Sequence, residues 1–256
     1  MIRTPVLFIH GVWLHASSWE CWAEHFTGHG YLAHAPGWPG EPATAREARE
    51  VRGGPGGVPD LGLDELTGHY AGIARSFEVP PVLVGHSVGG LVVQHLLGDG
   101  VGRAAVALAP APINEVELRG RECAPEGAGG VVELSAPRFR ELIGNTVGPE
   151  EAERLHERYA VPAPRRLVED VLLHRSTAVD TANPARGPLL LVSGQEDRLV
   201  PDRVTRTVYK QYGDSTAPTD LKQFADRGHS LTIDSGWRPV ADHVLGWLTE
   251  RGIRPR

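Results

Sequence analysis

A serine stands between two glycines at Gly85-His86-Ser87-Val88-Gly89, where an apolar run ends and a helix-like run begins. In a sharp turn from strand to helix, glycines two residues before and two residues after the serine let the two backbones approach closely. Such a turn presents the serine hydroxyl above the edge of the sheet. A serine between glycines is also common in ordinary turns, so the motif predicts a nucleophile only together with an acid and a base.

An acid and a base follow Ser87 where strands are expected to end. Asp197 comes just after the apolar run 189–192, and His229 lies in a loop before the last amphipathic helix. In this kind of site the histidine takes the serine proton, and the acid orients the imidazole. Two alternatives stay open: Glu196 is the working acid, or Asp197 only caps the next helix.

A glycine turn near the amino end is a candidate for half of an oxyanion hole. The strand expected at 5–9 ends in the sequence His10-Gly11-Val12-Trp13. The backbone N–H groups of Val12 and of Val88, which starts a helix, would both face a developing negative charge. Trp13 and Trp38 are candidate substrate-binding residues, and packing in the core is an equally good interpretation for each.

The other histidines are interpreted as packing or surface residues. We expect His10 to orient the glycine turn and His86 to pack beside Ser87. His25 and His29 have a helical spacing but no third ligand, so the sequence predicts no metal site. The predicted chemistry requires no cofactor, and the expected partner is a small-molecule substrate.

Strand and helix signals alternate along the chain, which predicts a mostly parallel sheet with helices on both faces. The apolar runs predict strands at 5–9, 30–35, 81–85, 103–109, 188–193 and 219–224. The patterns between them predict helices at 17–28, 63–77, 88–99, 202–212 and 237–250.

The segment 112–186 interrupts this alternation and contains no convincing strand. Its three charged helical patterns each begin with proline, at 137–145, 149–160 and 164–175. We therefore predict a core domain formed by 1–111 and 187–256, with 112–186 inserted as a small helical cap over the site. The glycine-rich stretch 52–59 is expected to be a mobile surface loop rather than a linker between domains.

The composition of the 256 residues fits one catalytic domain, since 41% are hydrophobic and can form a sizeable core. The net charge of −6 argues against a nucleic-acid partner and against an anionic membrane surface. No apolar stretch approaches the roughly 20 residues that span a bilayer, and no signal-like segment precedes the first strand, so we expect a cytoplasmic protein. Cys21 and Cys123 are expected to be free thiols, and the oligomeric state is left open.

The chain order Ser87, Asp197, His229 resembles that of the α/β-hydrolase superfamily, and the resemblance runs from Val6 to about Leu248. It implies the α/β-hydrolase fold, an α/β architecture in which helices flank the sheet and a small cap covers the site. It also implies roles for the three residues as nucleophile, acid and base. The chymotrypsin and subtilisin types use other chain orders.

The stretch from His10 to Trp22 is similar to a compact subgroup that contains bacterial esterases, plant methylesterases and hydroxynitrile lyases. The lyases carry a threonine and a lysine where this chain has Gly11 and Ser230, which favours the esterases. Epoxide hydrolases and haloalkane dehalogenases of this fold use an aspartate nucleophile, which Ser87 does not match.

The sequence thus predicts a serine hydrolase that cleaves a small or medium, fairly apolar ester or lactone through an acyl-enzyme on Ser87. Cleavage of a carbon–carbon bond, a thioester or another non-ester substrate by the same triad stays open, as does a non-catalytic ligand-binding homologue. An apolar substrate requires that four arginines of the cap face solvent, as expected for charged helix faces: Arg138, Arg140, Arg165 and Arg166.

Overall fold

A six-stranded sheet forms the centre of the computed structural model, which describes residues 3–51, 60–118 and 130–255. The strand order is β2-β1-β3-β4-β7-β8, and each pair of neighbouring strands is parallel. The strands are β1 (Pro5–Ile9), β2 (Leu32–His34), β3 (Val82–His86), β4 (Ala104–Leu108), β7 (Leu189–Gly194) and β8 (Thr219–Phe224). The predicted loop at 52–59 and the predicted free thiol of Cys123 lie outside the described residues.

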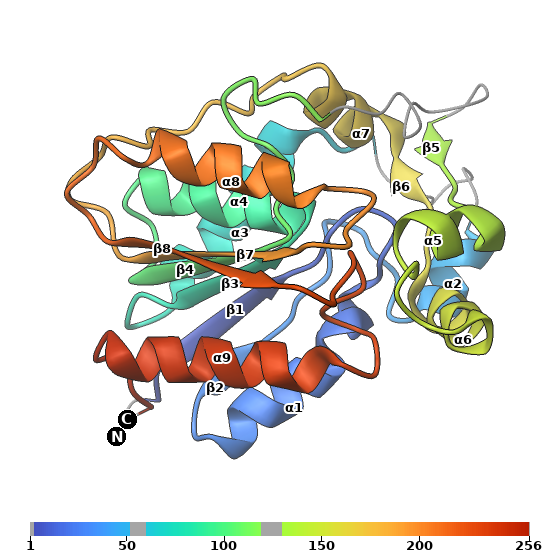
Figure 1. The fold of residues 1–256 in the computed structure, drawn as a ribbon, viewed down its shortest axis with the longest axis horizontal. Helices are drawn as coiled ribbons and strands as arrows, with labels where there is room; N and C mark the ends of the chain where they lie inside the picture. Colours follow the sequence, from blue (N-terminus) through green and yellow to red (C-terminus); the bar gives the residue numbers. More distant parts are fainter. Residues whose placement is uncertain (1–2, 52–59, 119–129, 256) are drawn as a thin grey trace.

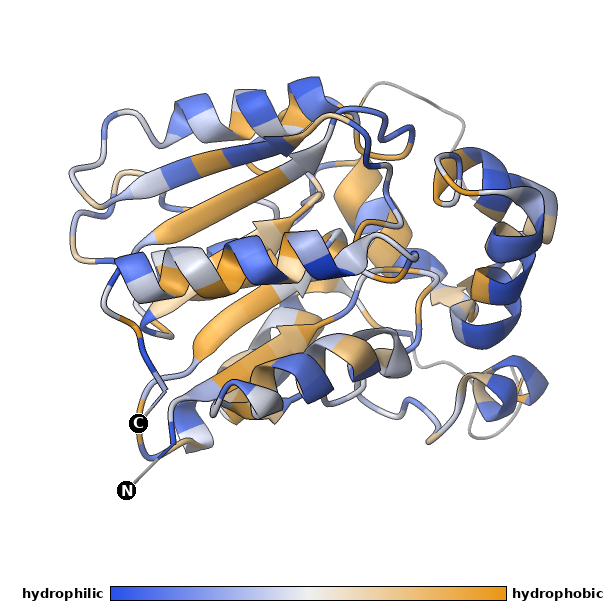
Figure 2. Cartoon of the chain, turned by 60° about the horizontal axis from the view of Figure 1, so that its bottom comes forward, coloured by the Kyte–Doolittle hydropathy of each residue, from blue (hydrophilic) through white to orange (hydrophobic). Residues whose placement is uncertain are grey.

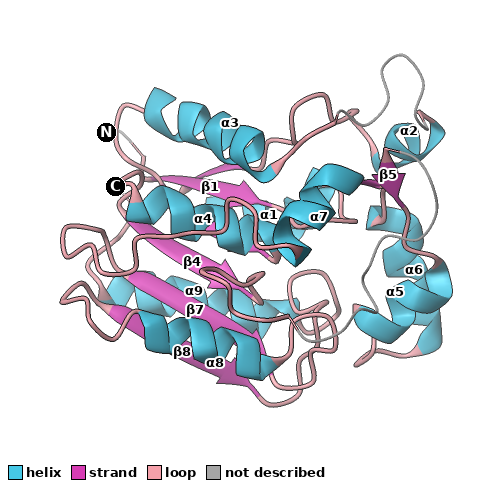
Figure 3. Ribbon diagram, turned by 90° about the horizontal axis from the view of Figure 1, so that it is seen from above, coloured by secondary structure: helices cyan, strands magenta, loops and turns pink. Residues whose placement is uncertain are grey.

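Helices cover both faces of this sheet, as predicted (Figure 1). One face carries α1 (Glu20–Gly28), preceded by the short η1 (Ala16–Trp19), and α9 (Trp237–Glu250). The other face carries α3 (Leu63–Ser76), α4 (Val88–Gly98) and α8 (Asp202–Gln211), which lie in front of the sheet in Figure 3. Within the described residues, no helix has both the length and the apolar character needed to cross a membrane.

Alternating side chains of the central strands supply two cores, one on each face of the sheet. In β1, Val6 and Phe8 pack on the side of α1 and α9, whereas Leu7 and Ile9 pack on the side of α3 and α4. Figure 2 shows the apolar central strands between helices whose outer surfaces are hydrophilic. Three aromatic side chains surround Phe8, with ring centroids between 5.0 and 6.5 Å away: Trp19, Trp22 and Phe26.

The described residues between β4 and β7 form three helices, as predicted, together with a short antiparallel strand pair that was not. The helices are α5 (Ala136–Leu142), α6 (Pro149–Tyr159) and α7 (Arg165–Leu172). The expectation of no strand here is wrong, because β5 (Val131–Val132) and β6 (Ala163–Pro164) form an antiparallel pair. Two residues per strand are too few to show an alternating pattern. The short helix α2 (Ala45–Glu50) was also missed, because its 6 residues are too few to show a helical period.

Backbone contacts join this segment to the turn that follows β1. The His15 N–H donates to the Tyr159 carbonyl oxygen at 2.9 Å, and the Val161 N–H donates to the Trp13 carbonyl oxygen at 3.1 Å. The indole N–H of Trp13 donates to the Val132 carbonyl oxygen at 3.1 Å. The three helices lie beyond one end of the sheet (Figure 1), as a cap would, and the domain boundaries at 112 and 186 stay a prediction.

A buried carboxylate connects α7 to the start of α3. Asp170 Oδ2 accepts the Leu63 N–H at 3.0 Å, and the preceding Gly62 has no side chain that could cap the helix. We expect Asp170→Ala to lower the free energy of unfolding by about 1–2 kcal/mol, because it leaves a buried N–H unpaired. Urea denaturation measures this change. The neighbouring Glu169→Ala should change stability by less than about 0.5 kcal/mol, and equal effects of the two variants would contradict the assignment.

Candidate active site

The turn at Ser87 holds a strained backbone between β3 and α4. Ser87 has φ 56° and ψ −118°, a region that residues other than glycine rarely occupy. A Cβ on Gly85 would lie 2.0 Å from the Gly89 carbonyl oxygen, and a Cβ on Gly89 would lie 2.1 Å from the Ile9 carbonyl oxygen. Both positions therefore require glycine, as the motif predicted. The strain is offset by close packing and by the Ser87 N–H, which donates to the Leu108 carbonyl oxygen at 3.0 Å.

Asp197 and His229 meet where the loops after β7 and β8 lie side by side. His229 Nδ1 donates to Asp197 Oδ2 at 2.7 Å, and both side chains are buried. Asp197 Oδ1 accepts the N–H groups of Leu199 and Val200 at 2.9 and 2.8 Å, so both carboxylate oxygens are held in place. The alternative acid, Glu196, has an exposed side chain. The geometry therefore favours Asp197 as the partner of His229.

His86 connects the serine turn to the histidine loop. Its ring lies 4.6 Å from the His229 ring between centroids, and its Nε2 donates to the His229 carbonyl oxygen at 2.9 Å. Complete burial, and then the proximity of His229, hold the pKa of His86 well below its usual range, so this side chain is neutral. It therefore packs beside Ser87, as expected, and also holds the backbone of the loop that carries His229.

Ser87 opens into an apolar cavity of about 370 Å³, mouth included. The predicted oxyanion residues Val12 and Val88 and the predicted substrate-binding residue Trp13 line the same cavity. A Cβ on Gly11 would lie 2.6 Å from Ser87 Cβ, so the glycine turn passes directly against the nucleophile candidate. The remaining wall is apolar and comes from α7 and from the loops after β4 and β7: Ala111, Leu118, Val168, Val171, Leu172, Leu199 and Val200.

Trp38 lies elsewhere. It lines a separate hollow with four prolines of the neighbouring segments, and its ring stacks on His10 with centroids 4.5 Å apart. The packing interpretation of Trp38 therefore fits its position better than a contact with substrate. Among the described residues, no group of three or more His, Cys, Asp or Glu side chains could hold a metal ion, and His25 instead contacts Asp242 at 2.7 Å.

Comparison with known proteins identifies the family. Residues 6–243 match the model of the alpha/beta hydrolase family. The chain belongs to this family. Membership confirms the predicted fold and supports a hydrolase enzyme. No curated protein sequence matches the chain at a significant level.

Solved structures share the fold of this α/β hydrolase over nearly its whole length. A monoacylglycerol lipase from Paleococcus ferrophilus is 20% identical, with a TM-score of 0.72 over 96% of this chain and 94% of that one. A methylesterase from Arabidopsis is 17% identical, with a TM-score of 0.70 over 96% and 99%. A pyrethroid hydrolase from Sphingobium faniae is 18% identical, with a TM-score of 0.65 over 96% and 97%.

Two parts of the site had no signal in the sequence. Glu41 lies behind the glycine turn, with Oε1 3.4 Å from His10 Nε2, and comes from an irregular segment more than thirty positions along the chain. The α7 wall, formed by Val168, Val171 and Leu172, belongs to a helix whose apolar face could equally have packed on the sheet. Neither position follows from local pattern, because both depend on contacts between distant segments.

The close approach of Gly11 to Ser87 can be tested by adding one methyl group. In Gly11→Ala the new Cβ would lie 2.6 Å from Ser87 Cβ and 3.3 Å from Ser87 Oγ, so the turn and its N–H groups must move. We expect kcat/KM for an ester substrate to fall by about 100-fold or more, the effect of losing an oxyanion donor. Gly28→Ala is the control, since nothing lies within 4 Å of a Cβ there. Activity of Gly11→Ala within a few-fold of the parent would contradict the assignment.

Proposed function

We propose that this α/β hydrolase is a serine esterase that cleaves small or medium, uncharged and apolar carboxylic esters or lactones. One observation carries the proposal: Ser87, on its strained turn, opens into an apolar cavity, and the residue before it, His86, contacts a histidine that is hydrogen-bonded to a buried aspartate. The similarity of the fold to a methylesterase and a monoacylglycerol lipase supports ester hydrolysis.

In the first half-reaction, Ser87 Oγ attacks the ester carbonyl carbon while His229 Nε2 takes the hydroxyl proton. The Asp197 carboxylate keeps the Nδ1 proton in place and stabilises the imidazolium. The tetrahedral oxygen receives hydrogen bonds from the N–H groups of Val12 and Val88. When the C–O bond breaks, His229 returns its proton to the leaving alcohol, and the acyl group remains on Ser87.

In the second half-reaction, His229 takes a proton from water, and the resulting hydroxide attacks the acyl carbonyl. Collapse of the second tetrahedral intermediate releases the carboxylic acid and returns the proton to Ser87. His86 contributes by holding the His229 backbone through its 2.9 Å hydrogen bond. No step requires a metal ion or an organic cofactor.

The cavity supports the proposed class of substrate. None of its described lining residues is charged, and an apolar wall favours an acyl group without charge. The cap arginines that would have favoured an anion do not line it: Arg138, Arg140, Arg165 and Arg166. Arg138 instead pairs with Glu141 at 2.7 Å, and Arg166 pairs with Glu65 at 2.9 Å.

Hydrolysis of p-nitrophenyl esters from acetate to decanoate, together with fluorophosphonate labelling, tests the proposal. We expect turnover and labelling in the parent and the loss of both in Ser87→Ala, because the nucleophile is gone. Ser76→Ala is the control, since this serine is exposed and donates only to the Ile73 carbonyl oxygen. Labelling without turnover of any ester or lactone would contradict an esterase, and labelling that survives in Ser87→Ala would contradict the nucleophile.

The α7 wall predicts how the acyl preference can be changed. Val171 is buried and lines the cavity, whereas Leu173 is 57% exposed. We expect Val171→Phe to shift the chain-length optimum to shorter esters, lowering kcat/KM for the longest good substrate by about 10–200-fold. Leu173→Phe should leave the optimum unchanged. An unchanged optimum in Val171→Phe would mean that this cavity does not bind the acyl group.

A further inference from the structure

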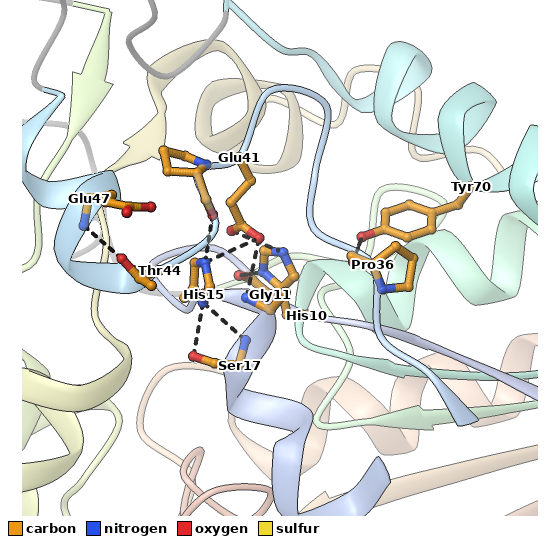
Figure 4. Close-up of polar contacts among 11 residues, drawn as sticks. His10, Gly11, His15, Ser17, Pro36, Glu41, Thr44, Glu47 and Tyr70 are labelled. Atoms are coloured by element: carbon orange, nitrogen blue, oxygen red, sulfur yellow. Dashed lines mark hydrogen bonds and ion pairs between the residues drawn. The ribbon is translucent and has the colours of Figure 1, made fainter. Parts of the chain in front are cut away.

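Three side chains that do not line the cavity at Ser87 meet beside the glycine turn: His10, Glu41 and His15 (Figure 4). Glu41 Oε1 lies 3.4 Å from His10 Nε2, and Glu41 Oε2 lies 3.8 Å from His15 Nε2. Both histidines are buried, and the Glu41 side chain is only 9% exposed. Charges are costly in such a place unless they are paired, so the protons of this cluster can be assigned from its hydrogen bonds.

The hydrogen bonds of the His15 ring indicate that it is neutral. Its Nδ1 accepts the Ser17 N–H at 3.1 Å, so Nδ1 carries no proton. Its Nε2 lies 3.0 Å from the Pro42 carbonyl oxygen, which can only accept, so the single ring proton is on Nε2. His15 therefore caps the short helix η1 and contributes no charge.

His10 has the opposite pattern, because both of its ring nitrogens face acceptors. Nδ1 lies 3.1 Å from the Gly11 carbonyl oxygen, which can only accept. Nε2 lies 3.4 Å from Glu41 Oε1, within ion-pair distance but without the geometry of a hydrogen bond. An unprotonated Nε2 would turn its lone pair toward the ionised carboxylate, so this arrangement favours a proton on both ring nitrogens. The ring of Trp38 stacks on His10 at an interplanar angle of 16°, which also suits a cation.

The other titratable groups that face this cluster agree with one positive charge, on His10, and one negative charge, on Glu41. Burial opposes the ionisation of Glu41, but His10 and the Ala16 N–H outweigh it and lower the pKa of Glu41. Burial, and then the Glu41 charge, hold the pKa of Tyr70 well above its usual range, and its hydroxyl donates to the Pro36 carbonyl oxygen at 3.0 Å. His86 is neutral, as described above. His10 and Glu41 therefore form the charged pair of the cluster.

We propose that His10 is a positioning residue that acts as an imidazolium, held by Glu41, and polarises the peptide between Gly11 and Val12. This peptide presents its carbonyl oxygen to His10 and its N–H to the proposed oxyanion, so the inference rests on the proposed function. A charged donor on the carbonyl oxygen makes the N–H of the same peptide a stronger donor. The fixed positive charge also stabilises the negative charge that develops in the transition state.

The protonation states can be tested without any activity. Nitrogen-15 spectra of the imidazole rings, at neutral pH, should show His10 with both nitrogens protonated and His15 with a proton on Nε2 only. The signals are assigned by their loss in His10→Asn and His15→Asn. In Glu41→Gln, His10 should retain the Nδ1 proton and lose the Nε2 proton. A neutral His10 in the parent would overturn the inference even if ester hydrolysis were established.

Kinetics test the consequence for catalysis. With the best p-nitrophenyl ester, we expect Glu41→Gln to lower kcat by about tenfold, less than the 10²–10³-fold loss of a whole oxyanion donor, with KM nearly unchanged. The loss of kcat should accompany the loss of the His10 Nε2 proton in the nitrogen-15 spectra. Glu47→Gln removes the same charge at an exposed position and should change neither property.

The kinetic result separates the two proposals. If the parent hydrolyses no ester, the proposed function fails, while the spectra still decide the charge on His10. If the parent is active and Glu41→Gln keeps the parent kcat, the inference fails and the esterase stands. A lower kcat in Glu41→Gln with an unchanged nitrogen-15 spectrum of His10 would also overturn it, since that is what a purely structural glutamate would produce.

Discussion

The arrangement of this protein depends on one steric constraint, the close approach of three backbones around Ser87. The turn after β3 brings Gly85 against Gly89, Gly89 against the end of β1, and the glycine turn at Gly11 against Ser87 itself. No side chain fits between these segments, so glycine is required at each contact. The contacts bring Val12 of the first turn and Val88 of α4 to the cavity into which Ser87 opens. A strained φ at Ser87 is stable only because its neighbours cannot move apart.

The glycine turn separates two unlike environments. Val12 lines the uncharged cavity at Ser87, and α7 supplies much of the cavity wall. His10 and Glu41, which we propose form a buried pair of opposite charges, contact the same turn through the Gly11 carbonyl oxygen. Because both side chains are buried, the charge of His10 acts on the peptide at short range and with little screening. The peptide between Gly11 and Val12 can therefore line an apolar cavity and still be polarised by the charge of His10.

The segment between β4 and β7 is connected to this turn rather than only resting on it. Hydrogen bonds from Trp13 and His15 reach β5 and the end of α6, and Asp170 connects α7 to α3. The wall of the cavity and the N–H groups of the glycine turn are therefore positioned together.

The sequence by itself determined the sheet, the helices on its two faces and the candidates Ser87, Asp197 and His229, because each of these follows from local pattern. Short apolar runs predict buried strands, and parallel strands bring the loops at their carboxyl ends to one edge. Glycines two positions from a serine predict a sharp turn because close backbone contact excludes a Cβ.

Only the tertiary structure decided which acid contacts His229, which tryptophan lines the cavity and which residue pairs with His10. Asp197 and Glu196 are neighbours in the chain. The loop after β7 turns the Asp197 side chain inward, against His229, and leaves the Glu196 side chain exposed to solvent. Trp13 and Trp38 are equally apolar, yet only Trp13 lines the cavity at Ser87. Glu41 comes from an irregular segment whose path is set by packing against α3 and the glycine turn. Such contacts join residues far apart in the chain, and no local periodicity records them.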